Sequence, residues 1–196
     1  MSKSTSLVAA LIAISVLVTV AGPAMGKGEE RQPIEKFRAN VYSPNLGKAT
    51  LLSISIYEWT SPEDRQALLQ IFVDGGSKAL YQALDKEGEK AYLKLPRTLG
   101  HEMRYAFQLE VEGKRRIVLA TDRPMGFLEL SRNTRSTDYN VSLVVIDLDP
   151  ETGVGEGQAL GGAELSIDKE TGRLNIEIHG TRPTKLTKVK PLKIKN

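Results

Sequence analysis

The side chains best suited to binding chemistry lie in the polar stretch 131–138, which carries two arginines, an asparagine and an aspartate. An arginine offers five N–H donors in a rigid fork that fits carboxylates and phosphates, and long loops often carry binding residues. This stretch is therefore a candidate ligand-binding loop, although a solvated loop without function is the plainer interpretation. With neighbours expected from other loops, the candidate binding residues are Arg132, Asn133, Arg135, Asp138, Arg123 and His101.

Signatures of catalysis and of metal binding are weak. The two histidines, His101 and His179, have no metal-ligating neighbours at a suitable spacing. No Gly-x-Ser-x-Gly motif is present, and the acidic run from Asp147 lacks the final glutamate of a calcium-binding loop. We predict no catalytic residue, no metal and no cofactor. Two carboxylates brought together by folding would leave no such signature.

The composition predicts a folded protein of ordinary charge. The chain has 196 residues, of which 40% are hydrophobic and 26% charged, with a net charge of +3. This excess of base is too small to indicate nucleic-acid binding. The lysine-rich stretch 185–195 is instead typical of an edge strand, in which Pro191 and the lysines prevent aggregation. The absence of cysteine excludes disulfides, thiolate catalysis and a lipid-modified cysteine.

The N-terminal residues predict a secretory signal peptide over 1–26. Lys3 precedes an uncharged apolar run over 7–20, and small residues suited to cleavage after residue 24 or 26 follow. The run is shorter than the roughly 20 apolar residues of a membrane-spanning helix. We therefore expect a periplasmic or secreted protein without stable membrane insertion after cleavage; an uncleaved N-terminal anchor is the alternative.

After a flexible lead-in over 27–34, the remainder, 35–196, reads as a single domain dominated by alternating apolar and polar residues. The clearest strand is 103–111, in which Met103, Tyr105 and Phe107 are expected to share one face. The stretch 139–148 is apolar on both faces, which predicts a strand covered on both sides. About ten short strands are expected, over 36–41, 49–59, 90–95, 103–111, 115–121, 125–130, 139–148, 158–167, 173–179 and 185–195.

The apolar period changes to that of a helix between the second and third strands. Ser61 and Pro62 are suited to a helix N-cap and first turn, and Asp74-Gly75-Gly76 is expected to end that helix. A second helix is expected to begin after Ser77. The sequence thus predicts a mainly β fold, an antiparallel barrel or sandwich, with one inserted helical hairpin over about 62–86.

Several short motifs resemble those of a group of uncharacterised exported bacterial proteins. The resemblance covers roughly residues 50–170, and it implies no activity and no catalytic residue. The motifs are Glu63-Asp-Arg-Gln-Ala-Leu68, Leu95-Pro-Arg-Thr-Leu-Gly100, Thr121-Asp-Arg-Pro124 and Asn133-Thr-Arg-Ser-Thr-Asp-Tyr139.

These observations favour an exported cell-envelope protein that binds a small molecule or an envelope ligand without catalysis. Its loops and helical hairpin would form the binding surface. One alternative is a carboxylate-dependent hydrolase acting on envelope polymers, and another is a structural or scaffolding partner. An apolar cavity would favour the binding protein, and a deep pocket with two carboxylates would favour the enzyme.

Overall fold

The computed structural model describes residues 31–43, 48–123, 125, 141–167, 174–178 and 183–194. Residues 31–196 form one compact unit. The predicted signal peptide and the candidate loop 131–138 lie outside the described residues. The predicted strand 125–130 also lies outside them, except for Met125.

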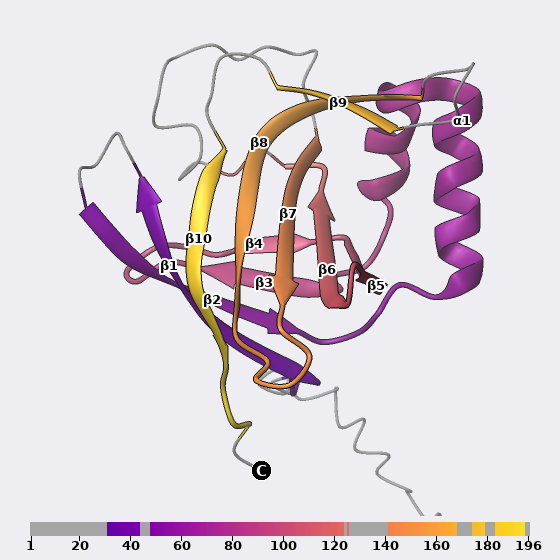
Figure 1. The fold of residues 1–196 in the computed structure, drawn as a ribbon. Coiled ribbons are helices and arrows are strands. Elements are labelled where there is room, and N and C mark those ends of the chain that lie inside the picture. The colour runs from indigo at the N-terminus through magenta and orange to yellow at the C-terminus, as the bar shows by residue number, and fades with distance from the viewer. Residues whose placement is uncertain are drawn as a thin grey trace, which may run out of the picture. The chain divides into compact units, whose positions relative to one another are not determined.

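Figure 1 shows a mainly β fold, as predicted, in which antiparallel strands form one sheet and a helix lies beside it. The elements are β1 (Glu35–Ser43), β2 (Lys48–Ile56), α1 (Pro62–Leu84), β3 (Ala91–Lys94), β4 (His101–Met103), β5 (Tyr105–Val111), β6 (Lys114–Thr121), β7 (Val141–Leu148), β8 (Gly155–Ile167), β9 (Leu174–Ile178) and β10 (Thr184–Pro191).

The sheet is nearly closed and barrel-like. Its strand order is β4-β3-β2-β1-β10-β8-β7-β6-β5, and β9 pairs only with β8. The first and last strands of this path, β4 and β5, are consecutive in the chain and are separated only by Arg104. One bent segment therefore pairs with β3 before the bend and with β6 after it.

This bend corrects the prediction of one uniform strand over 103–111. Met103 is fully buried, and beyond Arg104 it is Ala106 that faces the same core, while Tyr105 and Phe107 are only partly buried. The backbone N–H of Arg104 donates to Ala120 O at 2.9 Å, where the segment changes partner. The change of partner reverses which residues face inward, so Met103 and Tyr105 do not share a face.

The prediction of an edge strand at the C-terminus is wrong. β10 lies between β1 and β8 and pairs with both. Its lysines are exposed because they point away from the core, whereas Leu186 and Val189 are buried. The register shifts between these two residues, at the positive φ of Lys188 (52°). Pro191, the last residue of the strand, sits opposite Phe37.

The predicted helical region forms one helix, α1, with a kink where the break between two helices was expected. Ser61 caps it as predicted, because its hydroxyl accepts a hydrogen bond from the backbone N–H of Asp64 at 3.0 Å. Gly76 alone has non-helical dihedrals (φ 69°, ψ −164°), and Figure 1 shows the helix changing direction along its length. The Ser77 hydroxyl, expected to cap a second helix, contacts the N–H of Leu165 on β8 at 3.5 Å.

Two apolar clusters lie on opposite faces of the sheet. The inner face carries the larger one, which includes Phe37, Ile54 and Ile146. On the outer face, Val141 and Leu143 belong to a second cluster with residues of α1. The prediction that 139–148 is covered on both sides is confirmed only for the start of β7, where α1 covers Val141 and Leu143. Further along the same face, Val145 and Asp147 are only partly buried.

Candidate functional site

A cavity of about 300 Å³ lies between α1 and the outer face of β5 to β8. Its lining is almost wholly apolar. The helix contributes Leu68, Phe72, Leu80 and Leu84, and the strands contribute Val118, Ala120, Val141, Leu143 and Leu165. A volume of this size is at the lower end of the range for small-molecule sites, which runs from about 300 to 1,000 Å³.

Two different periodicities build the walls of this cavity. On α1, Leu68 and Phe72 are four residues apart and therefore lie on one helix face. On β6, Ile117 and Leu119 are fully buried in the inner core, so the alternating residues Val118 and Ala120 face the helix. The second half of α1 extends this wall, because the kink at Gly76 brings Leu80 and Leu84 to the same cavity, which stays open to solvent on one side.

Polar groups in the lining come from Arg65 on α1 and Tyr105 on β5. The guanidinium carbon of Arg65 lies 3.9 Å from the centre of the Phe107 ring, a close cation–π contact. Burial raises the pKa of the Tyr105 hydroxyl, and the charge of Arg65 opposes this only in part. At neutral pH the Tyr105 hydroxyl is therefore protonated, and it can donate a hydrogen bond.

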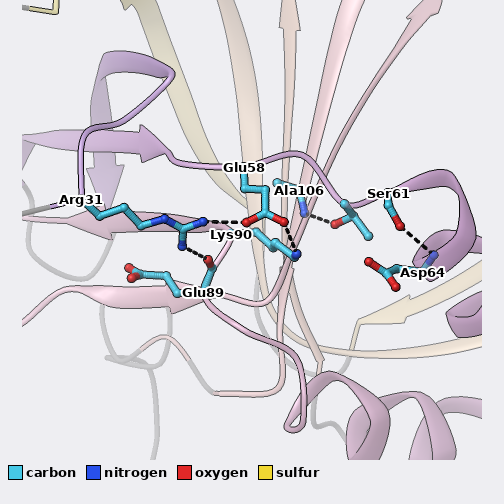
Figure 2. A network of polar contacts seen from close by, with 8 residues as sticks. Arg31, Glu58, Ser61, Asp64, Glu89, Lys90 and Ala106 are labelled. Carbon is cyan, nitrogen blue, oxygen red and sulfur yellow. Dashed lines mark hydrogen bonds and ion pairs between the residues drawn. The ribbon is translucent and has the colours of Figure 1, made fainter.

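A network of polar contacts fixes the connection between β2 and α1, and so positions Arg65 (Figure 2). The carboxylate of Glu58 accepts hydrogen bonds from Lys90 Nζ at 2.7 Å and from Arg31 at 2.6 Å. Thr60 is buried, its hydroxyl accepts from the N–H of Ala106, and its own N–H donates to the carbonyl of that residue. The connection that leads into the helix is thus attached to Lys90, just before β3, and to Ala106 of β5.

A second, wider groove of about 710 Å³ lies on the outer surface of β6, β7, β8 and β10. Its central charges are paired, since Arg116 donates to both carboxylate oxygens of Asp147, at 2.6 and 2.8 Å. The hydrogen bonds from Arg116 hold the pKa of Asp147 below its usual range. Because the charges at its centre satisfy each other, this groove is the weaker candidate for a ligand.

The structure also contains a pair of acidic residues that could be considered for catalysis, Glu89 and Glu102. Burial and the charge of Glu102 raise the pKa of Glu89, whereas Glu102 forms an ion pair with Arg104 at 2.9 Å. Glu89 and Glu102 line neither the cavity beneath α1 nor the wider groove. No cluster of three metal-ligating side chains occurs among the described residues.

Of the residues predicted as binding residues, only Arg123 and His101 can be compared with this cavity. Four of them, in the loop 131–138, lie outside the described residues. Arg123 is exposed just after β6, and its backbone N–H donates to the Thr121 hydroxyl at 3.3 Å. His101 is partly buried at the start of β4, opposite Leu93. Neither Arg123 nor His101 lines the cavity.

Sequence reasoning missed Arg65 and Tyr105. A signal for Arg65 was present, because it lies three and seven residues before Leu68 and Phe72 and therefore on their face of the helix. For Tyr105 the sequence offered no such signal. Its regular alternation with Met103 placed both on one face, and the bend at Arg104 is what turns Tyr105 towards α1.

Comparisons with known proteins add no relative from which a function could be transferred: no family model, no curated protein and no solved structure matches the chain. Within the described part of the chain, no helix is both long and apolar enough to cross a membrane.

Proposed function

We propose that this chain is an exported, non-enzymatic binding protein that holds a small apolar molecule in the cavity beneath α1. The observation that carries the proposal is the cavity itself, with about 300 Å³ of space and an almost wholly apolar lining. Apolar surface removed from water on binding is the main source of affinity in such sites. The location outside the cytoplasm rests on the apolar run over 7–20.

The proposal takes the fold as a barrel rather than a sandwich, and α1 as a two-armed hairpin. Support for the barrel comes from β4 and β5, which end the sheet path on either side of Arg104. Support for two arms comes from the non-helical dihedrals of Gly76. In this arrangement the barrel interior is filled by its own side chains, and the ligand binds on the outside, between the barrel and α1.

The alternatives have weaker support. A hydrolase needs two acids available at a cleft. The wider groove is lined by Asp147, Asp149 and Glu156. Asp147 is paired with Arg116, and Asp149 accepts hydrogen bonds from Thr152 in its own turn, so only Glu156 has no described partner.

A scaffolding role is favoured by Leu69 and Val73, which are 57% and 55% exposed on α1. Leu69 also lines the cavity, whereas Val73 does not. The experiment below therefore measures binding inside the cavity, which a docking role does not require.

The test is a titration with a neutral fluorescent naphthylamine, N-phenyl-1-naphthylamine, which brightens in apolar surroundings. Val118→Trp fills the cavity, and we expect it to weaken binding about tenfold or more, which corresponds to roughly 1.4 kcal/mol. Val154→Trp is the matched control, because Val154 is a partly buried valine in the other groove. Ala120→Leu provides a smaller filling substitution if the tryptophan prevents folding.

Binding by the wild type and the control, with loss in the filled variants, would support the proposal. An absence of probe binding to the wild type would contradict it. Equal binding by the wild type and all folded variants would also contradict it, since the probe would then bind elsewhere.

A further inference from the structure

The arginine at the cavity differs from the other half-buried arginines of the described chain. Arg104, Arg115 and Arg116 each form an ion pair, with Glu102, Glu35 and Asp147 respectively. Arg65 is half-buried in the same way, yet it has no carboxylate partner among the described residues. Its cost of partial desolvation is thus not offset by an internal anion.

The ring of Phe107 holds the guanidinium of Arg65 in place. Stacking at 3.9 Å covers one face of the planar group, whereas the N–H donors of a guanidinium point outward in its plane. Those donors therefore stay available beside the cavity. The Tyr105 hydroxyl lines the same cavity and has no hydrogen-bond partner among the described residues. Two adjacent donors beside an apolar space are suited to a molecule with an acceptor at one end.

From this arrangement we infer that the cavity binds a single-chain amphiphile that ends in a carboxylate, such as a free medium-chain fatty acid. The carboxylate head group of this ligand pairs with Arg65 and Tyr105. This inference rests on the proposed binding function and specifies its ligand class. The alkyl chain lies between Leu68, Phe72 and the outer face of the sheet. One guanidinium matches one negative charge, and a cavity of about 300 Å³ has room for one short chain.

The acids nearest to Arg65 in the sequence do not neutralise it. Glu63 and Asp64 occupy the first turn of α1, where negative charge complements the helix end. Neither forms an ion pair with Arg65, and the backbone N–H of Asp64 is bonded to the Ser61 hydroxyl. The positive charge at the cavity therefore remains available to an incoming anion.

The experiment displaces the neutral naphthylamine with three ligands that share a ten-carbon chain: decanoate, decanol and decyltrimethylammonium. Measurements are made at about pH 8, where a carboxylic acid is ionised, and below micelle-forming concentrations. For the wild type we expect decanoate to bind about tenfold more tightly than decanol, as a charge-assisted hydrogen bond provides. The ammonium compound should be the weakest competitor.

Arg65→Gln should reduce the preference for decanoate over decanol to within about twofold. The readout is the ratio of the two affinities measured on the same variant, so a change in probe affinity common to both ligands does not affect it. Arg38→Gln removes the same charge from an exposed position on β1 and should keep the preference. A wild type that binds the probe but shows no preference among the three ligands would overturn this inference and leave the proposed function standing. A wild type that does not bind the probe would overturn both.

A phospholipid could present similar chemistry, so a second arm uses vesicles of phosphatidylglycerol. We expect the protein to stay in the supernatant when these vesicles are sedimented. Co-sedimentation that Arg65→Gln abolishes would overturn the assignment to a free acid, because the anionic group would then belong to a membrane surface.

Discussion

The two faces of the sheet are packed differently, although the same strands build both. On the inner face, Ile54, Ile117 and Ile146 are fully buried in one continuous cluster. On the outer face, α1 packs over β6 to β8 but leaves about 300 Å³ unfilled, and Leu69 beside this space is 57% exposed. Close packing of the inner face therefore supplies most of the stability of the fold, because the outer face is packed incompletely.

A ligand-binding space of this kind can therefore form without opening the main core. A cavity inside the barrel would remove contacts from the residues that hold the sheet together. The outer cavity removes contacts only between the sheet and one kinked helix. Under the proposed function, binding and stability would thus depend on different faces of the sheet, and substitutions should separate them.

The largest expected difference in the free energy of unfolding is between a substitution in the inner core and a substitution on the outer side, at α1. Ile54→Ala should lower the free energy of unfolding by about 2–5 kcal/mol, because the lost contacts leave a void in a closely packed core. Leu69→Ala should cost less than about 1 kcal/mol, because that side chain is mostly in water already. Urea unfolding measures both values, and Ile54→Val provides a milder inner change. Similar losses at the two positions would contradict the contrast between the faces.

A smaller effect is expected at the kink of α1. Gly76→Ala should cost about 1–3 kcal/mol, because residues with a side chain rarely adopt its dihedrals. The added Cβ would meet no atom within 4 Å, so the cost measures backbone strain alone. Gly88→Ala is the control, since Gly88 has neither a positive φ nor a near neighbour. If both variants are equally stable, the direction of α1 does not depend on Gly76.

The smallest effect concerns the network that positions α1. The hydrogen bond from Lys90, with a further one from Arg31, holds the pKa of Glu58 below its usual range. A carboxylate with a lowered folded-state pKa contributes stability above its unfolded pKa, and that contribution is lost as the pH falls through the folded pKa. Glu58→Gln should therefore make unfolding less sensitive to pH below about 4.3, the ordinary value for glutamate.

Thermal melting between about pH 6 and pH 3 measures that sensitivity. Glu151→Gln is the control, because Glu151 is an exposed turn residue whose side chain forms no ion pair with a described cation. An unchanged pH profile in Glu58→Gln would show that the network contributes nothing to stability in acid.

Local patterns in the sequence predicted the elements well and their arrangement less well. A run of apolar residues on both faces identified β7, and Ser61 and Pro62 marked the start of α1, because these signals depend on neighbouring residues only. The turn after β7 is also set locally, since Gly153 has a φ of 66°, which a glycine adopts without strain. Such features need no knowledge of distant partners.

Errors arose where a distant partner decides the outcome. Lysines and a proline on β10 resembled an edge strand, yet exposed side chains on the outer face of an internal strand have the same composition. The bend at Arg104 follows from pairing with β3 on one side and β6 on the other, which local alternation does not encode. The cavity was missed for the same reason, since Arg65 and Tyr105 come together only through that bend.

The central position of β10 has a consequence for the order in which the fold can be completed. It joins two half-sheets, β4-β3-β2-β1 and β8-β7-β6-β5, by pairing with β1 and β8. During synthesis, β1 therefore has no partner on one side until nearly the whole domain has been made. Pairing over such a separation in sequence is slow. The last strand of the sheet in chain order is thus also the one that unites its two halves.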